Sequence, residues 1–215
     1  MEKAVLFDLD GTLLDTVHDI ADKVNSTLSH FGFAVRFLDE IKQRIGNGSE
    51  YLVRNSLPEG VEEEFFQEIY KYFKSLYSSG KDPKTCPFDG IKQVVKTFIE
   101  RGYRVFIVTN KPQSATDKIC KEQLSDVSFD KIVGQSNGIK CKPDKMATEQ
   151  ILAEFGVEKQ NAYFVGDGET DVQVAKNAGI NGIFVLWGYR TKEQLEKVGA
   201  SVFAKTPQDL LKLIP

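Results

Sequence analysis

Short apolar runs, rich in β-branched and aromatic residues, recur along the chain and alternate with segments of helical periodicity. The runs occupy residues 4–7, 103–108, 131–133, 162–165 and 182–186, with a weaker one at 201–204. Most lack strict apolar–polar alternation, which is the pattern of strands buried on both faces. We therefore predict an α/β fold with a doubly wound, mostly parallel sheet, and an α+β domain is the alternative.

The stretch from residue 15 to residue 84 breaks this rhythm, because it carries helical patterns and no convincing strand. Apolar residues keep helical spacing from Val17 to Phe31 and again from Phe65 to Leu76. Loop-forming residues border the stretch, at 14–16 on one side and 78–83 on the other. We expect residues 1–14 and 85–215 to form an α/β catalytic core, and residues 15–84 to form an all-helical cap, called the helical insertion below.

Bulk composition excludes several classes of protein. The net charge of -3 and the pI of about 5.6 give no bulk attraction to nucleic acid or anionic membranes. Neither a signal peptide nor an apolar run long enough to span a membrane is evident. The cysteines Cys86, Cys120 and Cys141 have no paired metal or redox spacing, which suits a reducing compartment. A cytoplasmic protein is expected.

Two carboxylates follow directly on the first apolar run. Asp8 and Asp10 lie where that strand ends, and ligands of open α/β sheets bind at the carboxyl ends of strands. Two acids spaced in this way repel each other unless a cation compensates their charge. Gly11 allows a sharp turn beside them. The sequence favours a catalytic or metal site here over a solvated turn with a capping Asp.

Two later parts of the chain carry groups that suit phosphate binding. Thr109 and Asn110 end the second apolar run, and the N-terminus of a helix after Pro112 completes the parts of a phosphate-binding cradle. The alternative is a simple helix N-cap. Lys142 precedes Pro143 and a further helix, and it can supply a positive charge to phosphate oxygens and to a carboxylate.

A second acidic cluster closes the run at 162–165. Asp167 and Asp171 are four residues apart at the start of a helix, so both can face the same site. Carboxylate oxygens suit Mg²⁺, whereas zinc is disfavoured because the only histidines are His18 and His30. The alternative is an N-terminal capping cluster.

These elements, taken in order, resemble the motifs of the haloacid dehalogenase-like superfamily of phosphohydrolases. The matching residues are Asp8-Leu9-Asp10-Gly11-Thr12, Thr109, Lys142 and Gly166-Asp167. The resemblance covers nearly the whole chain and implies a Rossmann-like core with a helical cap. Lys145 stands where that superfamily often has a second proline. Glu169 adds an acid to the last motif, which leaves the division of metal binding between Glu169 and Asp171 open.

The resemblance implies the roles of the site residues. Asp8 attacks phosphorus to form an aspartyl phosphate, and Asp10 protonates the leaving alcohol and then activates water. Mg²⁺ is held by Asp8, the backbone carbonyl of Asp10, Asp167 and Asp171, the last directly or through water. The phosphoryl oxygens are bound by Thr109 and Lys142, with backbone amides near Leu9 and Asn110.

The helical insertion is expected to select the substrate. Residues 44–48 resemble the glycine-bearing loop of phosphoglycolate phosphatase-like members, as do residues 186–190 near the rim of the site. From this loop we predict Arg44, Gly46 and Asn47 as substrate residues, with Arg44 pairing with a substrate carboxylate or phosphate; a solvated helix-end arginine is the alternative. A small-molecule phosphate ester, first of all 2-phosphoglycolate, is the expected substrate of a monomer or homodimer.

Other activities of the same class stay open. A sugar-phosphate mutase would use the same residues and return the phosphoryl group to a sugar, and a pyrophosphatase or nucleotidase would differ only in substrate. A dehalogenase is disfavoured because that chemistry needs no second acid such as Asp10. A phospho-receiver domain is disfavoured because it is shorter and lacks an insertion. An idle module that binds a phospho-ligand is the non-enzyme alternative.

Overall fold

A six-stranded parallel sheet forms the centre of the molecule. The structure is a computed structural model that describes residues 2–79 and 81–215, so Met1 and Gly80 lie outside the described residues. The strand order is β5-β4-β1-β6-β7-β8, and each neighbouring pair is parallel. The strands are β1 Lys3–Phe7, β4 Tyr103–Pro112, β5 Lys131–Gln135, β6 Ala162–Gly166, β7 Asn181–Val185 and β8 Phe203–Ala204. The predicted α/β fold is confirmed, and every predicted run forms a strand.

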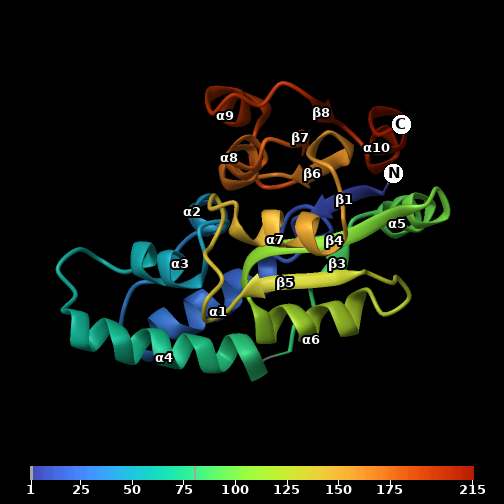
Figure 1. Ribbon diagram of the computed structural model, residues 1–215. Coiled ribbons are helices and arrows are strands. Elements are labelled where there is room, and N and C mark those ends of the chain that lie inside the picture. The colour runs from blue at the N-terminus through green and yellow to red at the C-terminus, as the bar shows by residue number, and fades with distance from the viewer. Residues whose placement is uncertain (1, 80) are drawn as a thin grey trace.

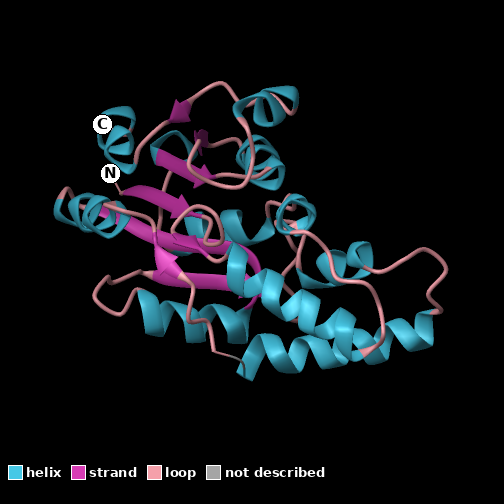
Figure 2. Cartoon of the chain, turned by 180° about the vertical axis from the view of Figure 1, so that it is seen from behind, coloured by secondary structure: helices cyan, strands magenta, loops and turns pink. Residues whose placement is uncertain are grey.

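Helices cover both faces of the sheet (Figures 1 and 2). Apolar residues of α5 (Ile91–Glu100), α6 (Gln113–Gln123) and α10 (Pro207–Leu213) pack against one face. Those of α7 (Met146–Glu154), α8 (Glu169–Ala178) and α9 (Lys192–Lys197) pack against the other, and a short 3-10 helix, Lys159–Asn161, precedes β6. In β1, Ala4, Val5, Leu6 and Phe7 are fully buried, because the strand is covered from both sides. This explains why its sequence is continuously apolar.

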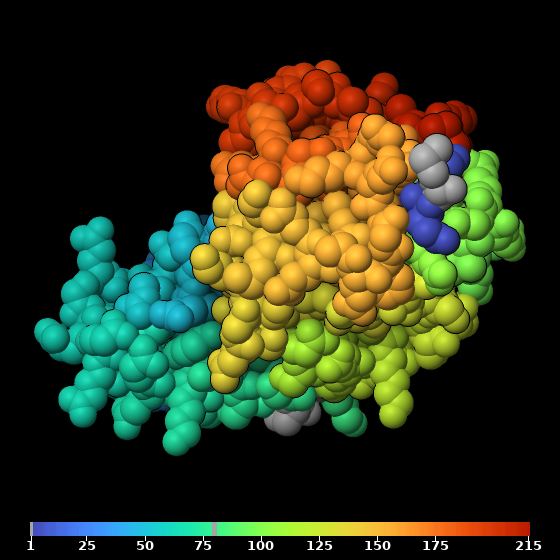
Figure 3. Space-filling model, in the orientation of Figure 1, coloured from blue at the N-terminus to red at the C-terminus, as the bar shows by residue number. Residues whose placement is uncertain are grey.

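The helical insertion builds a separate apolar cluster. It contains α1 (Val17–His30), α2 (Leu38–Arg44), α3 (Ser49–Ser56) and α4 (Glu63–Ser79). Val24, Ile41, Leu52, Phe66 and Phe73 are buried together there. Figure 3 shows these blue-to-teal segments extending to one side of the rest of the molecule. Two short strands, β2 (Leu14–Asp15) and β3 (Cys86–Pro87), pair antiparallel, so the chain enters and leaves the insertion at one place.

The sheet topology places the predicted motifs side by side. Strand β1 lies between β4 and β6. The chain first adds β4 and β5 on one side of β1, and later adds β6, β7 and β8 on the other side. Asp8 and Asp167 follow the carboxyl ends of β1 and β6, Thr109 lies in the last part of β4, and parallel strands bring all three to the same edge. Strand β4 continues past Val108 to Pro112 with a register shift, so Thr109 lies within the strand rather than after it.

Candidate active site

Three buried carboxylates meet at this edge of the sheet. One oxygen each from Asp8, Asp167 and Asp171 lies within 4.8 Å of the others. Burial, reinforced by the neighbouring acids, raises the pKa of Asp167 to about 8. Burial also raises the pKa of Asp8 to about 6, although Lys142 opposes the shift. Concentrated carboxylate oxygens of this kind fit a hard divalent cation such as Mg²⁺ and need its charge for stability.

Each of the two later acids is fixed by hydrogen bonds. Asp167 accepts from the Thr12 hydroxyl at 3.0 Å and from the backbone amide of Tyr189 at 2.8 Å. Asp171 accepts from the backbone amide of Gly168 at 2.9 Å. A methyl group on Gly188 would approach the Cβ of Asp167 to 2.3 Å, so the chain can pass behind this acid only as glycine. The sequence reasoning had not identified Gly188 as part of the site.

Lys142 links the acids from the two halves of the site. Its Nζ lies 2.8 Å from Asp8 Oδ1 and 2.7 Å from Asp171 Oδ1, and the side chain is buried. Burial alone would lower the pKa of this lysine, but the two carboxylates outweigh burial and raise it. The lysine is therefore a fixed positive charge against the Asp8 carboxylate.

Asn110 braces the loops around the site. Its side-chain amide donates to the carbonyls of Lys142 at 2.9 Å and Gly46 at 2.8 Å, and its oxygen accepts from the Lys142 amide at 2.7 Å. Sequence reasoning assigned only the backbone amide of Asn110 to phosphate. The side chain instead connects β4 to the lysine motif and to the helical insertion. The side chain of Leu9 is fully buried in the core.

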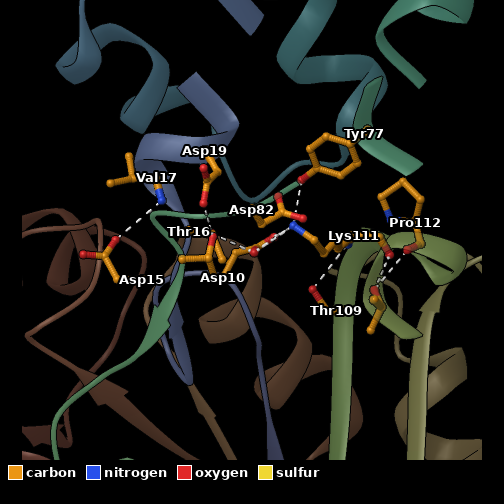
Figure 4. Close-up of polar contacts among 12 residues, drawn as sticks. Asp10, Asp15, Thr16, Val17, Asp19, Tyr77, Asp82, Thr109, Lys111 and Pro112 are labelled. Carbon is orange, nitrogen blue, oxygen red and sulfur yellow. Dashed lines mark hydrogen bonds and ion pairs between the residues drawn. The ribbon is translucent and has the colours of Figure 1, made fainter. Parts of the chain in front are cut away.

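Asp10 belongs to a second polar group at the base of the insertion (Figure 4). Both of its carboxylate oxygens contact Lys111 Nζ, at 3.0 and 3.1 Å, and Oδ1 also accepts from the Thr16 hydroxyl at 2.8 Å. Lys111 donates to the Tyr77 hydroxyl of α4 at 2.8 Å. Sequence reasoning had not assigned a role to Lys111 or Tyr77. Lys111 directly follows the Thr109-Asn110 motif, whereas the neighbours of Tyr77 in the chain carry no metal or phosphate motif.

A cavity of about 30 Å³ lies between the core and the insertion. The core residues that line it include Asp8, Asp10, Thr109, Asn110 and Lys111. The insertion contributes Ile20, Ile45, Gly46, Gly48, Ser49, Leu52 and Tyr77. This volume holds only one or two water molecules, so a phosphate ester needs more space than the cavity has in this structure.

The three residues predicted to bind substrate fall in different places. Gly46 lines the cavity, with a backbone φ of 116° that favours glycine, and Asn47 is exposed beside it. Arg44 does not line the cavity. It faces a separate hollow on the insertion together with Arg36 and Arg54, and its Nη2 lies 3.6 Å from Glu40. The structure thus brings Gly46, but neither Arg44 nor Asn47, to the cavity.

The segment after β7 ties the site to the insertion. Trp187 donates its indole N–H to the Thr12 carbonyl at 3.1 Å, and the Tyr189 hydroxyl lies 3.0 Å from the Thr16 hydroxyl. Arg190 is buried and donates to the backbone carbonyls of Lys42 and Ile45, at 3.0 and 2.7 Å. The resemblance to phosphoglycolate phosphatase-like members predicts that residues 186–190 lie near the rim of the site. In the structure, this segment contacts Thr12 and Thr16 and the backbone at the end of α2.

The fold and the site together define a class of enzyme. A parallel sheet whose strand ends carry clustered acids, a hydroxyl and a buried lysine, next to a cavity, defines a hydrolase of anionic esters built on a Rossmann-like sheet. A family model described as haloacid dehalogenase-like hydrolase matches residues 5–185, and the chain belongs to this family. No helix among the described residues has the length and apolar character needed to cross a membrane.

The alignments with similar proteins cover nearly the full chain. A phosphoglycolate phosphatase of Pseudomonas savastanoi pv. phaseolicola is 31% identical over 220 residues, covering 100% of this chain and 79% of the relative. A phosphoglycolate phosphatase of Aquifex aeolicus is 30% identical, with 99% and 96% covered. A crystal structure from Lactobacillus delbrueckii subsp. bulgaricus, provisionally assigned as a phosphoglycolate phosphatase, has a TM-score of 0.91 at 30% identity, with 100% and 99% covered. These relatives identify this chain as a phosphatase.

Proposed function

We propose that this phosphatase is Mg²⁺-dependent and hydrolyses a small phosphate monoester, with 2-phosphoglycolate as the leading candidate, through an aspartyl phosphate on Asp8. The observation that supports the mechanism most strongly is the carboxylate cluster of Asp8, Asp167 and Asp171 beside Lys142. The named substrate is supported by relatives called phosphoglycolate phosphatase that align over the whole chain.

The first half of the reaction uses groups that already face the cavity. The Asp8 carboxylate attacks phosphorus, and the bond from phosphorus to the ester oxygen breaks. Asp10, which lines the same cavity, gives its proton to the departing oxygen. Lys142 and Thr109 bind phosphoryl oxygens, because a fixed ammonium and a hydroxyl stabilise the charge that develops there.

In the second half, Asp10 takes a proton from water, and the water oxygen attacks the acyl phosphate of Asp8. Asp8 is then released as a carboxylate together with inorganic phosphate. Bound Mg²⁺, held by Asp8, the Asp10 carbonyl, Asp167 and Asp171, would offset the repulsion between the anionic nucleophile and the anionic ester. Residues 15–84 would act as the cap that selects the substrate, closing through Gly46, Ser49 and Tyr77, which line the cavity.

A screen of small phosphate esters, with and without Mg²⁺, tests this proposal. It should compare 2-phosphoglycolate, sugar phosphates, nucleotides and pyrophosphate in the wild type and in Asp8→Asn. We expect release of inorganic phosphate that depends on Mg²⁺, highest kcat/KM for 2-phosphoglycolate, and a loss of turnover of at least about 10³-fold in Asp8→Asn. If the enzyme prefers pyrophosphate, a nucleotide or a sugar phosphate, that compound replaces 2-phosphoglycolate as the proposed substrate. Normal kcat in Asp8→Asn would reject the mechanism.

A mutase remains the second candidate because it would use the same residues. Labelled phosphate from the ester would then appear on a sugar rather than free in solution. Cytoplasmic location and a monomeric or homodimeric state are predictions from the sequence alone.

A further inference from the structure

The cavity between core and insertion has one positive charge that the proposed reaction does not use. Lys111 is the only cation among the described residues that line this cavity. Lys142 does not line the cavity itself, and its ammonium is paired with Asp8 and Asp171. Arg44, the cation predicted from the sequence to bind a substrate anion, faces the separate hollow on the insertion. A second negative charge on the substrate therefore has Lys111 as its partner in this cavity.

The ammonium of Lys111 is held at the boundary of the two parts of the molecule. Its side chain is 4% exposed, and Nζ contacts Asp10 of the core and the Tyr77 hydroxyl of α4. Nζ also lies 4.6 Å from the centre of the Tyr77 ring. Lys111 therefore places an ammonium at the cavity wall, in contact with both parts of the molecule.

A ligand can share the donors of Lys111 with Asp10 and Tyr77. An ammonium has three donors, and three acceptor atoms face them here: both carboxylate oxygens of Asp10 and the Tyr77 hydroxyl. Asp10 needs only one of these donors, so a ligand oxygen can replace one of its two oxygens at the ammonium. The Tyr77 hydroxyl accepts from Lys111, so its own O–H is free to donate, and Tyr77 lines the same cavity. Figure 4 shows both side chains pointing toward each other, with Asp10 on the other side of the ammonium. Two donors thus converge beside the residue proposed to protonate the leaving group.

The remaining walls restrict what the leaving group can be. Ile20, Ile45 and Leu52 form the apolar part of the insertion side of the cavity, where a charged group would find no partner. A leaving group bound next to Asp10 would have its ester oxygen at the acid and its other end near Lys111. Because the cavity is small, an anion at that end fits a short leaving group, such as a small alcohol that carries a carboxylate.

We infer that Lys111, assisted by Tyr77, is the specificity-determining residue that binds a carboxylate on the leaving group of the ester. The inference rests on the proposed function and adds to it the residue that recognises the carboxylate of the leaving group. A carboxylate accepts from an ammonium and a phenol in charge-assisted hydrogen bonds, which are strong where water is excluded. A neutral leaving group offers Lys111 only an uncharged, weaker acceptor, which disfavours such substrates.

The test compares two esters that differ only at the recognised group. 2-Phosphoglycolate carries the carboxylate, and 2-hydroxyethyl phosphate carries a neutral alcohol in its place. We expect the wild type to prefer 2-phosphoglycolate, and Lys111→Met to lose about 10- to 100-fold of that preference in kcat/KM, mainly through KM. Lys111→Arg retains the charge and should retain part of the preference. Thermal unfolding of each variant shows whether it folds.

Lys23→Met is the matched control. Lys23 is also a buried lysine, pairs with Asp82 and lies 5.2 Å from the centre of the Tyr77 ring, but it does not line the cavity. Its replacement should leave the ratio of the two kcat/KM values unchanged. If Lys111→Met lowers both values equally, Lys111 acts only on Asp10, and the inference is overturned while the proposed function stands.

An inhibition assay separates this inference from the proposed substrate. With p-nitrophenyl phosphate as the substrate, phosphonoacetate carries the carboxylate and ethylphosphonate does not. We expect phosphonoacetate to inhibit the wild type more strongly, and Lys111→Met to remove the difference. If 2-phosphoglycolate proves not to be preferred, the proposed substrate fails, and the inhibition constants still decide the role of Lys111. Equal inhibition of the wild type by both phosphonates overturns the inference that Lys111 binds a carboxylate.

Discussion

Glu169 binds Arg190 through both of its carboxylate oxygens, at 3.0 and 2.8 Å. The same guanidinium donates to carbonyls at the end of α2 in the insertion. One side chain therefore connects the motif that carries Asp167 and Asp171 to the insertion that covers them. Because Arg190 already neutralises Glu169, and Asp171 belongs to the carboxylate cluster, this pairing favours Asp171 over Glu169 as the further metal ligand.

Arg190→Ala is expected to weaken closure of the insertion. The variant removes the donors to the Lys42, Gln43 and Ile45 carbonyls, so the cavity residues would be less well positioned over the ester. We expect kcat/KM to fall by about 10- to 100-fold, with faster amide hydrogen exchange over residues 38–49. Arg54→Ala is the control, because Arg54 forms exposed ion pairs with Glu50 and Glu63 on the same insertion. Equal effects of the two substitutions would contradict the role of Arg190.

Asp10→Asn should show a loss that depends on the leaving group. An alkoxide such as that of glycolate needs a proton as it departs, whereas p-nitrophenolate leaves without one. We expect kcat to fall by about 10²- to 10⁴-fold for 2-phosphoglycolate, and formation of the phospho-enzyme from p-nitrophenyl phosphate to be affected much less. Rapid-quench measurement of the p-nitrophenol burst checks this. An equally slow burst would argue against Asp10 as the general acid.

Stability without metal should fall as the pH rises. The pKa of Asp167 is raised from 3.8 to about 8 in the folded chain, so between these values the folded state binds more protons than the unfolded state. Stability is then greatest below pH 3.8 for this group and declines as the pH approaches 8. Mg²⁺ competes with those protons, so the rise in Tm on adding Mg²⁺ should grow from about pH 5 to about pH 8. Differential scanning fluorimetry measures both trends.

Asp167→Asn supplies the control for the metal experiment. Removing this charge should flatten the decline in metal-free stability and abolish most of the Mg²⁺ response. Each kcal/mol gained or lost moves Tm by about 2–4 °C in a chain of this size. A full Mg²⁺ response in Asp167→Asn would place the ion elsewhere.

Gly188→Ala should damage the metal site from outside the motifs. The added methyl carbon would lie 2.3 Å from the Cβ of Asp167, and that buried side chain is held by Thr12 and Tyr189. Displacing it should weaken Mg²⁺ binding and lower kcat/KM by about 10²-fold. In Gly168→Ala, the nearest atom is Asp171 Oδ2 at 3.4 Å, which is an ordinary contact. The two variants should therefore differ in their Mg²⁺ dependence.

The sequence alone determined the sheet and the core of the site. Runs buried on both faces predict parallel strands, and acids placed directly after such runs must lie at the carboxyl edge. Asp8, Asp167 and Asp171 were identified in this way, and the structure brings them together. Lys142 and Thr109 follow the same rule, although the structure places Thr109 inside β4 rather than beyond its end.

Only the tertiary structure decided which residues of the insertion and the final loop face the cavity. Arg44 has a suitable charge in a suitable loop, yet α2 directs it to another hollow. Tyr77 and Lys111 are far apart in the sequence and meet because α4 packs near the end of β4. Arg190 donates to backbone carbonyls, and Gly188 lets the chain approach Asp167 closely. Neither kind of contact requires a particular residue type in the partner, so neither can be predicted from the sequence pattern. Local periodicity fixes where strands end, but the packing of one part on another fixes which side chains share a cavity.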